Sequence, residues 1–103
     1  MNLLGQLKKG TTRLAALERG EAYGYGIRRE VFHRTRGLFA IDEGVLYPLL
    51  HALERKGMVR ARIEQVKGRE RRYYTLTAKG RRELALARRE WRHVRESMDA
   101  LLR

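Results

Sequence analysis

The sequence predicts a mostly helical α+β fold that forms one small domain. Its 103 residues are enough for a single hydrophobic core, and 43% of them are apolar, as in an ordinary folded protein. Over most of the chain, apolar residues recur with the period of about 3.6 residues that marks a helix. Between residues 58 and 77 they alternate with polar residues instead, which is the period of a strand. We therefore expect several helices and one hairpin.

Two helices are expected at the start of the chain, over residues 1–19 and about 23–35. Leucines recur along the first, although Gly10 weakens its middle. The inward face of the second is predicted to carry Tyr23, Ile27 and Val31. The stretch "ERGEAYGYGI" between them is typical of a glycine-rich turn. In the connector after the second helix, residues 38–40 are expected to form a short strand.

A third helix is expected from Asp42, whose carboxylate suits the N-cap, to Gly57, which suits the position after the last turn. One face of this helix is apolar and carries Leu46, Leu49, Leu50 and Leu53. Pro48 lies in the second turn, where it removes one backbone donor and crowds the carbonyl four residues earlier. We expect the helix to tolerate this local defect.

The face opposite the leucines carries Gly44, Tyr47, Pro48, His51 and Arg55. We expect this face to bind DNA, because the family that the chain resembles, named below, places the corresponding helix in the major groove. Gly44 allows a backbone to approach closely, and the amides of the first turn favour a phosphate. Tyr47 offers a hydroxyl and an aromatic face, while Pro48 offers a flat apolar surface for a thymine methyl. The alternative is that Tyr47 and Pro48 pack against the hairpin.

Positive charge is the dominant feature of the composition. The chain has 24 Lys and Arg residues against 12 Asp and Glu residues, a net charge of +12. Residues 66–82 hold seven basic residues and one acidic residue, so that 7 − 1 = +6 and half of the excess lies there. A local excess of this kind is typical of a polyanion partner, most commonly nucleic acid. The alternative is a charged surface that only keeps the protein in solution.

The hairpin is expected to join strands over residues 58–65 and 72–77 through a turn at Gly68. Its tip is basic and carries four residues that we expect to neutralise phosphates: Lys67, Arg69, Arg71 and Arg72.

A last helix is predicted from the N-cap Thr77 to the C-terminus. Its apolar residues alternate in steps of three and four, as in a heptad: Leu84, Ala87, Trp91, Val94, Met98 and Leu101. Such a seam predicts a homodimer, and the alternative is that it packs against the first helix of the same chain. The order of the elements is that of a winged helix-turn-helix. We expect residues 1–76 to form the DNA-binding region and residues 77–103 the dimerisation helix of one compact unit.

Other classes of function find little support in the sequence. Cysteine is absent, which excludes disulfides and thiolate metal sites, and the three histidines lie in three different elements. We therefore expect no metal or cofactor. No pair of carboxylates and no Ser-His-Asp set is placed for catalysis, so we expect no enzyme. No apolar run of 18 residues and no signal peptide is present, which makes the cytoplasm the expected location.

Two long motifs make the chain resemble the PadR family of bacterial transcriptional regulators. They are "EGVLYPLLHALERKG", residues 43–57, and "YYTLTAKG", residues 73–80; the shorter "YGYGI" adds to them. The resemblance covers nearly all of the chain and is closest to the short members with a single C-terminal helix. One departure is the stretch between Gly10 and Gly20, which is about one turn shorter than usual.

The resemblance implies a homodimer that binds a palindromic operator, with the third helix in the major groove and the wing at the minor groove or backbone. It also implies a repressor that a small phenolic or drug-like molecule releases. Trp91 stands where such members sense their ligand between the subunits, although it could equally be a large residue that closes the seam. The alternative function is a winged-helix module for nucleic-acid or protein binding without ligand sensing.

Overall fold

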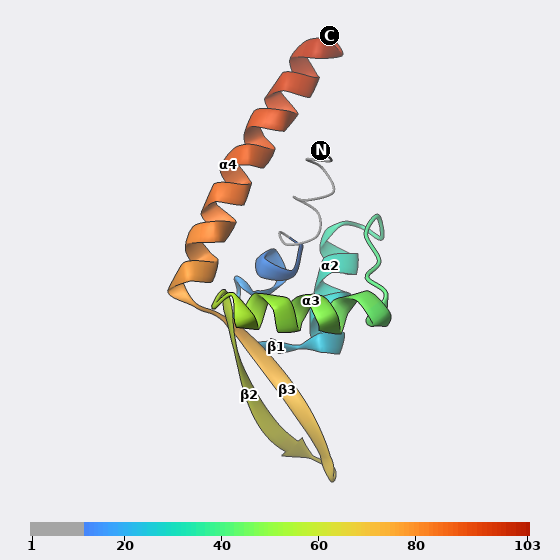
Figure 1. Ribbon diagram of the computed structural model, residues 1–103. Coiled ribbons are helices and arrows are strands. Elements are labelled where there is room, and N and C mark those ends of the chain that lie inside the picture. Colours follow the sequence, from blue (N-terminus) through green and yellow to red (C-terminus); the bar gives the residue numbers. More distant parts are fainter. Residues whose placement is uncertain (1–11) are drawn as a thin grey trace.

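The structure, a computed structural model, describes residues 12–103. Residues 12–17 are helical, and they precede the helices α2 (Gly24–Arg34), α3 (Glu43–Arg55) and α4 (Ala78–Leu101). The strands are β1 (Ala22–Tyr23), β2 (Val59–Val66) and β3 (Arg69–Leu76). Figure 1 shows the hairpin of β2 and β3 projecting from one end of a helical body and α4 projecting from the other. The part of the first predicted helix before residue 12 lies outside the described residues, whereas most of the shortened stretch between Gly10 and Gly20 is described.

The predicted ends of α3 are confirmed. The Asp42 carboxylate accepts a hydrogen bond of 3.1 Å from the amide of Gly44, which makes it the N-cap. Gly57 follows the helix with a φ of +75°, a conformation that glycine adopts without strain. Three of the four predicted leucines, at positions 46, 50 and 53, are buried.

The hairpin is longer and its turn tighter than predicted. β2 and β3 pair antiparallel over eight residues each, from Val59 opposite Leu76 to Val66 opposite Arg69. Lys67 and Gly68 both have positive φ, 52° and 77°, as in the two-residue turns that match the twist of a hairpin. Most of the predicted basic tip therefore lies in β3, where successive side chains alternate between the two faces of the sheet.

The second predicted helix is confirmed as α2, with Tyr23 and Thr35 as its caps, but the short strand expected after it is absent. Residues 38–40 form no strand. The hydroxyl of Thr35, just after α2, accepts a hydrogen bond of 3.0 Å from the amide of Phe39 and holds this stretch as a loop. The third strand is β1 instead, which pairs with β3 through Ala22 opposite Tyr74. Tyr23 thus ends a strand and caps α2 with extended backbone rather than lying inside the helix.

The core gathers one face from every helix of the described chain and from the inner face of the sheet. It contains Leu14, Ala16, Leu17, Ile27, Val31, Ile41, Leu46, Leu50, Leu53, Val59, Tyr74, Leu76 and Leu84. Thr77 caps α4 as predicted, since its hydroxyl accepts from the amide of Gly80 at 3.1 Å. Only the first turns of α4 reach the core. Within residues 12–103, no helix is long and apolar enough to cross a membrane.

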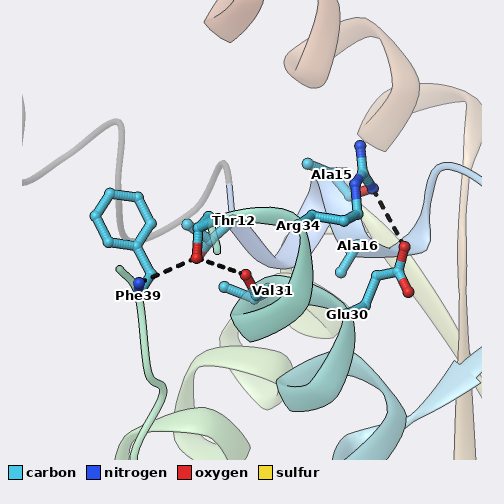
Figure 2. A pocket seen from close by; sticks show the side chains of 8 residues that line it. Thr12, Ala15, Ala16, Glu30, Val31, Arg34 and Phe39 are labelled. Carbon is cyan, nitrogen blue, oxygen red and sulfur yellow. Dashed lines mark hydrogen bonds and ion pairs between the residues drawn. The ribbon is translucent and has the colours of Figure 1, made fainter. Parts of the chain in front are cut away.

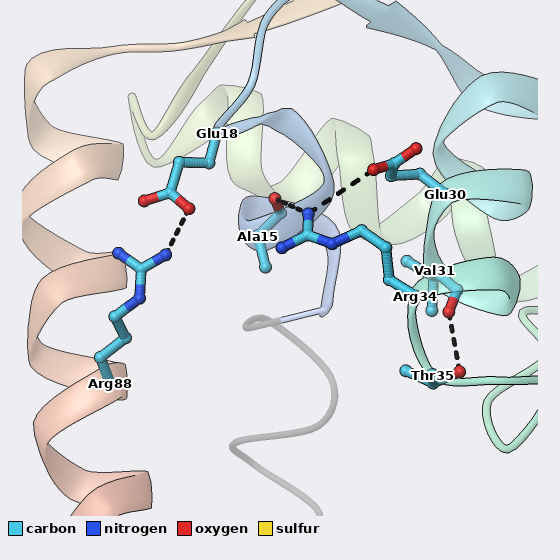
Figure 3. A network of polar contacts seen from close by, with 7 residues as sticks. All are labelled: Ala15, Glu18, Glu30, Val31, Arg34, Thr35 and Arg88. Carbon is cyan, nitrogen blue, oxygen red and sulfur yellow. Dashed lines mark hydrogen bonds and ion pairs between the residues drawn. The ribbon is translucent and has the colours of Figure 1, made fainter.

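A small polar network holds residues 12–20 against the two helices beside them. Figure 3 shows Arg34 of α2 between Ala15 and Glu30, where it donates to the Ala15 carbonyl at 3.1 Å and lies 3.7 Å from the Glu30 carboxylate. Glu18 pairs with Arg88 of α4, and this guanidinium lowers the pKa of the Glu18 carboxyl. The helical N-terminal segment is therefore joined to α2 and to α4 by side chains.

A shallow pocket of about 240 Å³ lies between that segment and α2. Figure 2 shows its apolar lining by Ala15, Ala16, Val31 and Phe39, with the Glu30 and Arg34 pair at one side. The pocket lies away from the predicted DNA-binding residues, and none of the predicted site residues lines it.

Candidate nucleic-acid interface

The structure places all five predicted residues of α3 on its exposed face: Gly44, Tyr47, Pro48, His51 and Arg55. The leucines of the opposite face hold the helix in the core, so this face is turned to solvent. Tyr47 is 40% exposed, which leaves part of its ring free and part packed. Pro48 has no amide hydrogen to donate to the carbonyl of Gly44, and this carbonyl consequently lacks the usual helix partner.

The packed part of Tyr47 lies against Gly24 in the first turn of α2. A Cβ on Gly24 would lie 2.6 Å from the Tyr47 hydroxyl oxygen and 2.9 Å from the ring carbon that bears it. The motif "YGYGI" was expected to be part of a turn, so this contact was not predicted. The signal that could have found it was a glycine inside a helix, where glycine is otherwise unfavourable.

Arg69 and Arg71 share one face of the hairpin, which is also the face of aromatic side chains. Arg71 lies with its guanidinium carbon 4.3 Å from the centre of the Tyr23 ring, and Tyr23 meets Tyr73 edge-on at 5.7 Å. Arg62 covers Tyr73 at 4.5 Å in the same way. Guanidinium groups are attracted to the faces of aromatic rings, and this contact leaves their N–H groups free to bind other partners.

Arg62 differs from Arg71 because carboxylates already hold it. Its guanidinium donates to both oxygens of Glu21, at 2.7 and 2.8 Å, and also lies 3.4 Å from Glu64. The pair raises the pKa of Arg62 and lowers the pKa of Glu21. Arg62 is therefore neutralised within the protein, and the free positive charge of this face lies nearer the turn.

Arg72 lies on the other face of β3, toward α3. Its guanidinium donates to both carboxylate oxygens of Glu54, at 3.1 and 3.3 Å. Tyr74, which is fully buried, and Glu54 together raise the pKa of Arg72. Of the four predicted wing residues, Arg72 thus has a carboxylate partner that joins the hairpin to the last turn of α3, while Lys67, Arg69 and Arg71 lie at or near the turn on the exposed hairpin.

The apolar seam of α4 divides into two parts. Leu84 is buried in the core, and Ala87 and Val94 are half-buried. Trp91, Met98 and Leu101 are 47%, 45% and 73% exposed. The second half of α4 therefore presents a row of large apolar side chains outside the core of its own chain.

Three helices, a hairpin with a basic end and a helix with a capped start define a winged helix-turn-helix. The family model of the PadR-like transcriptional regulators matches residues 14–86 of this chain, which is more than half of it. The chain therefore belongs to the PadR-like family of transcriptional regulators. The protein is therefore a transcriptional regulator, which implies that it regulates transcription by binding DNA.

Individual proteins are similar to this chain over most of its length. An uncharacterized protein of Lysinibacillus sphaericus is 35% identical over 83 residues, which cover 80% of this chain and 76% of that one. A PadR family transcription regulator from Clostridium difficile R20291 is 31% identical, with a TM-score of 0.79, and the match covers 92% of this chain and 98% of that one. A transcriptional regulator from Clostridium thermocellum has the same fold, with a TM-score of 0.86 at 24% identity and coverage of 97% and 98%.

Within residues 12–103, no three His, Asp or Glu side chains are grouped closely enough to hold a metal ion. The three histidines lie in α2, α3 and α4.

Proposed function

We propose that the protein is a repressor that binds a palindromic operator as a homodimer and leaves it when a small aromatic or drug-like molecule binds. The observation that carries this proposal is the division of α3. Leu46, Leu50 and Leu53 are buried, while Gly44, Tyr47 and Pro48 are exposed. Beside them lies a hairpin whose Lys67 and Arg69 have no carboxylate partner among the described ion pairs. A helix with such a face fits the major groove, and the hairpin then reaches the adjacent backbone or minor groove.

The residues of α3 have different roles in this proposal. Gly44 lets the DNA backbone approach the first turn closely, although its own amide already donates to the Asp42 carboxylate and is not free for a phosphate. Tyr47 and Pro48 contact base edges and a thymine methyl, while His51 and Arg55 extend the same face toward neighbouring bases or phosphates. These contacts supply the discrimination between the operator and other DNA.

The wing supplies affinity for any DNA sequence. Lys67, Arg69 and Arg71 neutralise phosphates and release the counterions bound there. Arg72 contributes less of this charge, because Glu54 already holds it, and its larger effect is on the position of the wing.

The dimer is formed by α4 of two chains. The apolar row of Trp91, Met98 and Leu101 supports this, since large exposed apolar surfaces mark sites of association. A twofold dimer places two α3 helices on two half-sites, which is what a palindrome requires.

The effector is proposed to bind beside Trp91 in this dimer. The half-exposed indole is the largest aromatic surface on α4, and two copies could stack on a flat ligand from both sides. Titration of the Trp91 fluorescence with phenolic acids and planar cationic dyes, alongside DNA binding, tests this part. Quenching that lowers DNA affinity supports a ligand-released repressor, whereas no quenching, or quenching without an effect on DNA, favours a regulator without a ligand at this site.

The DNA interface is tested by the salt dependence of binding. Replacing both Arg69 and Arg71 by Ala should weaken binding to every sequence and reduce the slope of log affinity against log salt by about 2. The matched control replaces Arg89 and Arg92, two exposed arginines of α4 away from the seam, and should leave the slope unchanged. An unchanged slope in the wing variant would show that the wing does not bind the phosphates.

A further inference from the structure

The motif "YGYGI" places two glycines, Gly24 and Gly26, in the first turn of α2. Glycine weakens a helix relative to alanine, so each glycine there needs a reason. Neither of the two has a positive φ, since the positive-φ glycines of the described chain are Gly20, Gly37, Gly57 and Gly68. Backbone conformation therefore explains neither glycine, and what remains to compare is what surrounds each of them.

The surroundings of the two glycines differ. A Cβ on Gly26 would lie 3.7 Å from its nearest neighbours, the side chains of Ala22 and Tyr23, which is an ordinary contact. A Cβ on Gly24 would lie 2.6, 2.9 and 3.0 Å from three atoms, and all three belong to the Tyr47 side chain. Gly24 is buried under that ring, and a methyl group there has no room while the ring stays in place.

We propose that Gly24 is a positioning residue for DNA recognition, because its bare backbone is the surface on which the Tyr47 ring is held. This inference rests on the proposed role of Tyr47 in reading DNA. Tyr47 reaches across from α3 to α2, so its orientation depends on both helices of the helix-turn-helix. Residues that hold a contacting side chain in one orientation determine how well it discriminates between bases.

The atoms in this contact indicate whether the Tyr47 ring or helix α2 would move if a methyl group were added at Gly24. The atoms that crowd the added methyl are at the end of a side chain that is 40% exposed, and they are not backbone atoms. Rotation of the ring toward solvent relieves the overlap, whereas movement of α2 would disturb the buried Ile27 and Val31. Gly24→Ala should therefore displace Tyr47 and leave the fold intact.

The test compares G24A, Y47A, the double variant and the control G26A. Each full-length protein is titrated with a duplex that the wild type selects from a random pool and with a random duplex of the same length. We expect G24A and Y47A each to lower the affinity ratio of the two duplexes on the order of tenfold, with the affinity for random DNA unchanged. G24A should have no further effect in the Y47A background, and G26A should behave as the wild type.

Two failures are distinguishable. If Y47A keeps the wild-type ratio, the proposed reading role of Tyr47 is wrong, and Gly24 has no such role either. If Y47A lowers the ratio but G24A does not, or if G24A lowers it equally in the Y47A background, the inference about Gly24 is overturned. Circular dichroism and thermal unfolding accompany each titration. If G24A does not fold, the inference requires that the double variant does fold, because removing the Tyr47 ring makes room for the methyl group. A double variant that does not fold either would also overturn the inference.

Discussion

The apolar row on α4 makes a quantitative prediction about assembly. Met98 and Leu101 are 45% and 73% exposed in one chain, and both would be covered in a dimer through α4. Replacing both by Glu puts a charge in place of each apolar group within the proposed contact. The substitutions touch no residue of the core and no residue of the proposed DNA interface.

The expected magnitude follows from the exposed fractions. Burying a whole Leu or Met side chain contributes about 1.5–3 kcal/mol. The part still exposed is therefore worth about 1–2 kcal/mol at Leu101 and about 1 kcal/mol at Met98. A twofold dimer contains each residue twice, which gives roughly 4–6 kcal/mol and a dissociation constant raised by roughly three to four orders of magnitude.

Sedimentation equilibrium at micromolar concentration measures this change. We expect the wild type to be a dimer. The M98E/L101E variant should be a monomer that no longer binds the operator tightly. The control is A85E/A100E, which adds the same charge on the side of α4 away from the seam and should remain dimeric. A monomeric wild type, or a dimer that survives both Glu residues, would refute the assignment of the seam.

Three further predictions concern contacts within one chain. A Cβ on Gly80 would lie 2.1 Å from the Met58 carbonyl oxygen, so Gly80→Ala should destabilise the fold by about 1–3 kcal/mol or more, seen as a lower Tm in thermal unfolding; an unchanged Tm would contradict it. Glu54→Gln should free Arg72 and lower operator affinity with no fall in the salt slope, measured by titration at several salt concentrations. Arg88 lowers the pKa of the Glu18 carboxyl, so the ionised carboxylate stabilises the fold above the ordinary pKa of 4.5. This stabilisation is lost as the pH falls from 4.5 through the lowered pKa of the folded state. The stability difference between the wild type and Glu18→Gln, measured by urea unfolding, should therefore shrink in acid.

Features that depend on neighbours in the sequence were predictable. Asp42 and Thr77 cap their helices as expected, because a cap is decided by a side chain and amides two or three residues away. Gly57 and Gly68 have positive φ at the two places where the change in the apolar pattern predicted the end of one element and the start of the next. The alternation in residues 59–66 likewise predicted β2 without any knowledge of its partner.

Features that depend on distant residues were not predictable. β1 has only two residues and exists because Tyr23 meets Tyr73, fifty positions away, so no local pattern announces it. The strand expected at residues 38–40 had suitable residues but no partner, and Thr35 bonds there instead. Arg72 was grouped with the wing by charge, although it belongs to the predicted strand 72–77. Its carboxylate partner, Glu54 of α3, lies 18 positions away and could be identified only from the structure.

Contacts of α3 join it to each neighbouring part of the domain. Tyr47 lies on Gly24 of α2, and Glu54 binds Arg72 of β3. The loop after α3 packs its Met58 carbonyl against Gly80, in the first turn of α4. Because these contacts leave little room for adjustment, α3 and the wing should move with the start of α4 rather than independently of it. A ligand between two α4 helices would then act by changing the distance between two rigid reading heads, and the shape of each head would stay the same.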